Sequence, residues 1–201
     1  TGRQRGFRAR SVVGGVFLPM LYDRELWSKW AGRDKTRSSG WAPMPRPPRI
    51  VPVAPTAEKQ AVTWRYTFEQ PALEWRDAVF DDAGWASGPA GFGAEDTPGA
   101  VVRTPWKSGE IWLRREFRLP RRPEGEVRIR IHHDEDAEVY LNGVAALSVT
   151  GYTVDYEQRS VAPAALDTLR AGRNVIAIHC RQTSGGQYID AGLVELAPAA
   201  P

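Results

Sequence analysis

The sequence predicts an all-β protein: a jelly-roll β-sandwich preceded by a short helical segment and a proline-rich linker. Three observations favour this fold class. Apolar residues alternate with polar ones from Val62 to Leu196, turn-forming residues separate the alternating runs, and no helical pattern of ten residues lies between them. With 19 Gly, 16 Pro and 8 Trp in 201 residues, the composition fits a turn-rich sandwich.

Charge and cysteine content exclude several functions. The net charge is +3, and the densest basic run, residues 3–10, is too short to predict a nucleic-acid partner. No apolar stretch approaches about 18 residues, so no membrane partner is predicted. Cys180 is the only cysteine, which excludes an intrachain disulfide and a cysteine-based zinc site, and its place at the end of NVIAIHC predicts a buried strand residue.

The N-terminal third has a helical apolar period from Ser11 to Ala31. Val13, Val16, Phe17 and Met20 are spaced for one helix face, and Leu26, Trp27 and Trp30 repeat that spacing after Asp23. Because two short helices cannot bury these side chains on each other, residues 1–35 are predicted to be the helical remnant of a preceding domain.

A proline-rich segment follows. The stretch WAPMPRPPRIVPVAP, residues 41–55, holds six prolines, which favour polyproline II. We therefore predict a stiff linker over residues 36–60 and a β-sandwich module over residues 61–201.

Within the module, alternation predicts the individual strands. Trp64, Tyr66 and Phe68 share one face of the first. The other predicted strands cover residues 111–119, 127–131, 138–141, 145–149, 174–180 and 188–196, and the pair Asn142-Gly143 predicts a hairpin turn.

The stretch HHDEDAEVYLNG, residues 132–143, is the densest polar run and allows several interpretations. A hydrogen-bonding corner between two strands is favoured, because Asp bonds its own backbone well. A calcium site using Asp134 and Asp136 is the second interpretation. Zinc is disfavoured because adjacent histidines on a strand point to opposite faces. An acid–base carboxylate pair would have to face across a cleft, which this spacing does not ensure.

Four segments together resemble a known family: IWLRREFRLP, EVRIRIHHDEDAEVYLNGV, TGY and LRAGRNVIAIHC. Over roughly residues 61–197 they are similar to the galactose-binding-like jelly roll that precedes the catalytic barrel in glycoside hydrolase family 2 enzymes. The resemblance implies a carbohydrate-binding or accessory module of an exported bacterial protein, either secreted or periplasmic. The matching positions are Phe117, Leu119, Val139, Tyr140, Asn142, Gly143, Gly151, Tyr152, Leu169, Gly172, Asn174, Ile176 and Ala177.

A second resemblance covers the first third. The segments RSVVGGVFLPML and LWSKWAGRDK, with the proline-rich run after them, are similar to the end of the helical-toroid domain of bacterial glutaminase-like proteins. This resemblance implies an upstream catalytic domain as partner, and it places no catalytic residue on this chain.

Sugar binding needs an aromatic platform flanked by groups that bond paired hydroxyls. Alternation within SGGQYID predicts that Tyr188 and Asp190 face outward together while Ile189 points to the core. The predicted ligand-binding residues, all in loops or at strand ends, are Trp106, Tyr152, Tyr156, Gln182, Gln187, Tyr188 and Asp190.

The alternative function is an accessory domain that packs on a missing catalytic toroid without binding sugar. Catalysis by this chain is not predicted, because motifs of the type G-x-S-x-G and H-E-x-x-H are absent from the sequence. His179 lies within a strand pattern and is predicted to be structural. Apart from the possible structural calcium, no cofactor is predicted.

Overall fold

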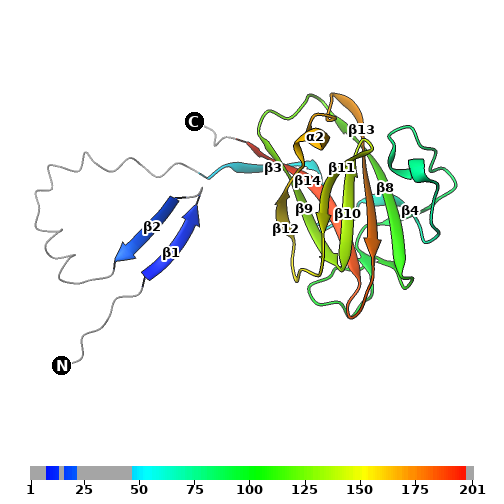
Figure 1. Ribbon diagram of the computed structural model, residues 1–201, viewed down its shortest axis with the longest axis horizontal. Coiled ribbons are helices and arrows are strands. Elements are labelled where there is room, and N and C mark those ends of the chain that lie inside the picture. The colour runs from blue at the N-terminus through cyan, green and yellow to red at the C-terminus, as the bar shows by residue number, and fades with distance from the viewer. Residues whose placement is uncertain (1–7, 14–15, 22–46, 198–201) are drawn as a thin grey trace, which may run out of the picture. The chain divides into compact units, whose positions relative to one another are not determined.

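The computed structural model describes residues 8–13, 16–21 and 47–197. The chain divides into two compact units, Thr1–Pro45 and Arg46–Pro201. The second unit is an all-β sandwich of two sheets, which confirms the predicted fold class (Figure 1). Among the described residues, no helix has the length and apolar character needed to cross a membrane.

The first unit contains a hairpin where a helix was predicted. Strands β1 (Arg8–Val13) and β2 (Val16–Leu21) pair antiparallel, with Val13 opposite Val16 and Arg8 opposite Leu21. The helical expectation over residues 11–21 is therefore wrong: β-branched valines flank a Gly-Gly pair, and both favour a hairpin over a helix. The helix predicted after Asp23 lies outside the described residues.

Both sheets have six strands; the one whose strands hold more residues, which we call the larger sheet, has the strand order β11-β10-β13-β8-β4-β5. The long pair β8·β13 forms its centre, with Leu113 opposite Ile178. A 3-10 helix, η2 (Leu73–Arg76), follows β4. The strands of the larger sheet are β4 (Thr63–Thr67), β5 (Ala86–Pro89), β8 (Glu110–Leu119), β10 (Asp136–Leu141), β11 (Val144–Val149) and β13 (Gly172–Arg181).

The second sheet has the order β12-β9-β14-β6-β7, and β3 also pairs with β14. The helix α2 (Pro163–Leu166) follows β12 and lies beside β11 (Figure 1). The strands of this sheet are β3 (Arg49–Ala54), β6 (Phe92–Gly93), β7 (Thr104–Pro105), β9 (Glu126–Asp134), β12 (Glu157–Ser160) and β14 (Tyr188–Ala197).

Strand β3 corrects the linker prediction. Residues 49–54 do not form a free polyproline segment, because they pair antiparallel with β14, with Pro52 opposite Val194. Proline lacks an N–H, yet it is tolerated on an edge strand, where one side of the backbone needs no partner. The module therefore includes at least part of the segment assigned to the linker.

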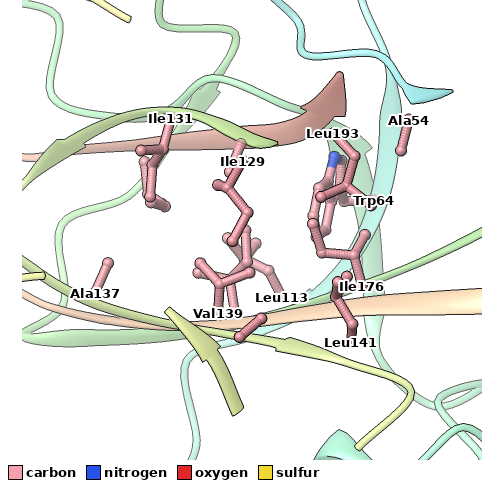
Figure 2. Close-up of a cluster of buried hydrophobic side chains, with 14 of the residues drawn as sticks. Ala54, Trp64, Leu113, Ile129, Ile131, Ala137, Val139, Leu141, Ile176 and Leu193 are labelled. Carbon is pink, nitrogen blue, oxygen red and sulfur yellow. The ribbon is translucent and has the colours of Figure 1, made fainter. Parts of the chain in front are cut away.

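The core lies between the two sheets (Figure 2). Leu113, Val139 and Ile176 reach it from the larger sheet, while Ile129 and Ile131 reach it from the second. All are at most 1% exposed, and each such burial contributes roughly 1.5–3 kcal/mol. The alternation that predicted the strands is thus the alternation of core-facing residues.

The Asn142-Gly143 turn is confirmed between β10 and β11. Both residues have positive φ, 48° and 92°, as such a turn requires. The side-chain Nδ2–H of Asn142 donates to Asn174 Oδ1 at 2.9 Å, and the side-chain Oδ1 of Asn142 accepts the Val175 N–H at 2.9 Å. This asparagine therefore fastens the turn to β13 as well as forming it.

Candidate functional site

The residues predicted to bind sugar do not form an open platform. Trp106 and Tyr188 are fully buried, Asp190 is 2% exposed, and Gln187 is also buried. The Trp106 indole N–H donates to Ser108 Oγ at 3.0 Å, so the polar edge of its ring is already satisfied. Tyr188 and Asp190 do lie on the outer face of β14, opposite the core residue Ile189, as predicted, but other segments cover that face and neither side chain reaches solvent.

A buried polar cluster occupies this outer face of the second sheet, and we define it as Tyr156, Tyr188, Asp190 and His132. The Tyr156 hydroxyl donates to Asp190 Oδ2 at 2.5 Å and lies 3.2 Å from the Tyr188 hydroxyl. The same carboxylate oxygen accepts the Ala57 N–H at 2.7 Å. The cluster thus joins the sheet to segments from distant parts of the chain.

His132 completes the cluster from the neighbouring strand. It is opposite Asp190 in the β9–β14 register, and its ring centroid lies 4.5 Å from that of Tyr188. Its Nε2–H donates to the Thr153 carbonyl at 3.1 Å, because a carbonyl can only accept. The neutral ring is therefore held in one tautomer beneath the loop that carries Tyr156.

Burial controls the protonation of this cluster. Loss of solvation raises the pKa of Asp190 to about 6, although the Tyr156 and Ala57 hydrogen bonds favour the ionised form. Desolvation also raises the pKa of Tyr156 and lowers that of His132. These directions describe groups withdrawn from water, which is the opposite of an accessible sugar-binding rim.

Two of the predicted residues remain at the surface. Tyr152 is 68% exposed, and Gln182 is half-buried with its amide N–H donating to the Gly185 carbonyl at 3.3 Å. The backbone of Tyr152 forms an isolated antiparallel β-bridge with that of Asp134. The loops therefore bring one exposed ring to the end of the sandwich.

The acidic corner has its own partners. Asp136 Oδ1 accepts the Gly151 N–H at 3.1 Å, and its Oδ2 lies 3.3 Å from Arg181. Desolvation raises the pKa of Asp134. Within the described residues, no three His, Cys, Asp or Glu side chains are arranged to hold a metal ion. Calcium binding at Asp134 and Asp136 stays a prediction.

An open groove lies at the other side of the sandwich, and we call it the β10–β11 groove. Its volume is about 500 Å³. One wall is the outer surface of β10 and β11, and the other is the segment after β12, which is fastened to β11 because the Ala162 N–H donates to the Ala146 carbonyl at 2.9 Å. The lining residues are Glu138, Tyr140, Ala145, Ala146, Leu147, Ser148, Ser160, Val161, Ala162 and Pro163.

The polar side of this groove is a second tyrosine–carboxylate pair. The Tyr140 hydroxyl donates to Glu138 Oε2 at 2.8 Å, and the Glu138 side chain is 52% exposed. Desolvation and this bond to Glu138 raise the pKa of Tyr140. The ring is supported from behind by Trp75, which meets it edge-on with centroids 5.6 Å apart.

A stacked pair continues the polar surface beyond the groove. The His179 imidazole lies parallel to the Trp112 ring, with centroids 4.7 Å apart. Its Nε2 lies 3.0 Å from Glu110, and its Nδ1 lies 3.8 Å from Glu138. The imidazole is thus held between the Trp112 ring and the Glu110 carboxylate, and the structural role of His179 stays a prediction.

The sequence contained a signal for this groove that the prediction did not use. Glu138 and Tyr140 alternate with core residues Val139 and Leu141, so period two places them together on the outer face of β10. The missing information was the position of residues 160–163, which form the opposite wall. No short-range pattern gives that contact.

Comparison with known proteins finds likenesses among solved structures and none among family models or curated sequences. Similar solved structures include a glycosyl hydrolase family 2 member from Bacteroides cellulosilyticus, at 15% identity over 70% of this chain and 20% of that one, with a TM-score of 0.48. Another is Bacteroides uniformis β-glucuronidase 2, at 20% identity over 72% of this chain and 18% of that one, with a TM-score of 0.48.

A third is a β-glucuronidase from Ruminococcus gnavus, at 12% identity over 78% of this chain and 30% of that one, with a TM-score of 0.48. This chain thus spans less than a third of each of the three proteins. Likenesses of this extent carry no conclusion about activity. One of the three is described as a glycosyl hydrolase family 2 member and two as β-glucuronidases, and none supports the glutaminase-like parent implied for residues 1–35.

Proposed function

We propose that this chain is a non-catalytic accessory module of a larger glycan-active protein and that it binds carbohydrate in the β10–β11 groove. The observation that carries the proposal is the groove itself: an open hollow of about 500 Å³ with one apolar wall and a tyrosine–carboxylate pair. Ligand sites in proteins commonly have volumes of about 300–1,000 Å³.

The groove offers the two kinds of contact that a sugar needs. The Tyr140 ring lines the groove together with small apolar side chains such as Ala145 and Pro163, and these apolar groups suit the C–H face of a pyranose ring. Glu138 can accept hydrogen bonds from adjacent hydroxyls, and the hydroxyls of Ser148 and Ser160 can both donate and accept. Oxygen-rich polar groups beside an apolar surface are favourable for neutral sugars.

The set of residues that line the groove argues against catalysis there. Glycoside hydrolysis by the usual route needs two carboxyl groups on opposite sides of the scissile bond. Glu138 is the only carboxylate among the described residues that line the groove, and Glu110, which is bonded to His179, lies outside it. Binding without reaction is therefore the chemistry we assign.

The larger protein belongs to the proposal as well. The resemblance of residues 61–197 to a galactose-binding-like jelly roll favours an accessory place beside a catalytic domain, in a secreted or periplasmic bacterial protein. In that setting, a groove of this size would hold a glycan chain near the catalytic domain and raise the local concentration of the glycan there.

Titration of the 201-residue chain with glucose, xylose and galactose oligomers tests the proposal. The substitution Ala145→Trp fills the groove from an exposed position on β11. We expect it to weaken binding at least tenfold while leaving the melting temperature within a few degrees of the wild-type value. The matched control is Tyr152→Ser, which removes the exposed ring at the end loops and should leave affinity unchanged.

Two results would count against the groove. If Tyr152→Ser abolishes binding and Ala145→Trp does not, the sugar binds at the loops, as the sequence predicted. If no oligomer binds the wild-type chain, the carbohydrate function is overturned.

The alternative accessory role, packing on another domain, has a specific observation in its favour. Val101, Tyr152 and Val154 are 44%, 68% and 64% exposed, and all belong to the loops that cover the buried polar cluster. Exposed apolar side chains on neighbouring loops are a common feature of docking surfaces. Failure of every sugar titration, together with stable binding to the adjoining domain that Tyr152→Ser weakens, would establish this role instead.

A further inference from the structure

We infer that the β10–β11 groove discriminates between sugars by charge, binding amino sugars more tightly than neutral ones and rejecting uronic acids. The inference rests on the proposed carbohydrate function and adds the class of ligand. It depends on which ionisable side chains line the groove and on where the nearest cations are held.

The lining carries negative charge without a positive counterpart. Among the described residues that line the groove, Glu138 is the only charged side chain, and lysine, arginine and histidine are absent. One of its oxygens accepts the Tyr140 hydroxyl, and no hydrogen bond from the described part of the chain reaches the other. A ligand therefore meets a carboxylate that still has an accepting oxygen.

The nearby basic side chains do not themselves line the groove. His179 is bonded to Glu110 at 3.0 Å and lies 3.8 Å from Glu138, on the side of the sheet centre. Arg181 is paired with Asp136. The Arg76 guanidinium lies 5.3 Å from the centre of the Tyr140 ring and makes a cation–π contact there. None of these three residues lines the groove.

The consequence for a ligand follows from simple electrostatics. An ammonium group placed beside Glu138 gains a charge-assisted hydrogen bond, whereas a uronate carboxylate is repelled. Because Glu138 is half exposed, solvent screens both effects, and each corresponds to about a fivefold change in affinity, as for exposed ion pairs. Neutral sugars should lie between the two.

Three probes that differ in one substituent measure this preference: glucosamine, glucose and sodium glucuronate. Binding to the 201-residue chain is followed by NMR titration at pH 7 and low salt, which also shows whether resonances of β10 and β11 shift. We expect glucosamine to bind about fivefold more tightly than glucose, and glucuronate about fivefold more weakly. High salt should compress these ratios.

Glu138→Gln separates charge from shape. It keeps the size of the side chain and an accepting oxygen, so affinity for glucose should change less than about threefold while the three sugars become equal within about twofold. Glu110→Gln is the matched control, because it removes a carboxylate that also contacts His179 but lies outside the groove. It should leave the wild-type ratios intact.

The outcomes distinguish the charge selectivity of the groove from its proposed carbohydrate function. If glucose binds and glucuronate binds equally well, the charge selectivity is overturned and the proposed function stands. If the ratios persist in Glu138→Gln, Glu138 is not the source of selectivity and the inference also fails. If none of the sugars binds the wild-type chain, the proposed function itself falls.

Discussion

The two tyrosine–carboxylate pairs of this domain differ in environment rather than in chemistry. Tyr156 donates to Asp190 at 2.5 Å on the outer face of one sheet, and Tyr140 donates to Glu138 at 2.8 Å on the outer face of the other. Asp190 is 2% exposed, whereas the Glu138 side chain is 52% exposed. The same hydrogen bond thus fastens loops where it is covered, and where it is open it leaves a carboxylate that we propose as a ligand contact.

The covering segments cause the difference. On the second sheet, the backbone of Ala57 and the loop carrying Thr153 and Tyr156 bond directly to Asp190 and His132, so the polar groups face protein on all sides. On the larger sheet, the segment after β12 stops at the edge of β11 and leaves a groove in front of Glu138.

The largest predicted effect is on the stability of the buried pair. Tyr156→Ala should lower the free energy of unfolding by about 3–5 kcal/mol, because it removes a buried aromatic ring and leaves Asp190 without its hydroxyl donor. Tyr152→Ala, which truncates an exposed tyrosine four residues earlier, should change stability by less than about 0.5 kcal/mol. Urea denaturation of both variants measures the contrast. Equal losses would contradict the structural role of the cluster.

The pH dependence of stability should show that Asp190 is withdrawn from water. Its folded-state pKa of about 6 lies above the ordinary value of 3.8, so the folded protein holds a proton that the unfolded chain has released. The wild-type protein should therefore lose up to about 3 kcal/mol of stability from this group as pH rises from 4 to 7.

Asp190→Asn isolates this contribution, because an amide does not ionise. The stability of the variant relative to wild type should rise by about 3 kcal/mol between pH 4 and pH 7. The lowered pKa of His132 has the opposite effect, destabilising the fold as pH falls through about 6.5, but it acts on both proteins and cancels in the difference. Chemical denaturation at several pH values checks this, and a flat difference would show that the Asp190 carboxyl is solvated.

The sequence predicts the strands of this domain better than its site, and the reason is the range of the interactions. Val139 and Leu141 alternate with Glu138 and Tyr140 within one strand, so a local period identifies both the core face and the outer face of β10. The burial of Asp190 depends on Ala57, which is 133 residues away, and no local pattern contains that contact.

The helix prediction for residues 11–20 was wrong because two local sequence signals compete there. Residues 11–20 show a helical apolar spacing, but they also contain β-branched valines around Gly14-Gly15, and the second signal agrees with the strands found at residues 8–13 and 16–21. The density of prolines likewise predicted a linker. In the structure, β3, which contains Pro52, pairs with β14 as an edge strand, where proline is tolerated.

The smallest predicted effect compares the two hydroxyl groups alone. Tyr156→Phe should cost about 1–3 kcal/mol, because Asp190 Oδ2 then loses a donor in a buried setting. Tyr140→Phe should cost less than about 0.5 kcal/mol, because water can replace the hydroxyl at the half-exposed Glu138. Thermal unfolding of both variants, at a pH where Asp190 is ionised, measures the pair of values. If Tyr140→Phe costs more stability than Tyr156→Phe, the Tyr140–Glu138 hydrogen bond stabilises the fold. The proposal that Glu138 is available to bind a ligand would then be rejected.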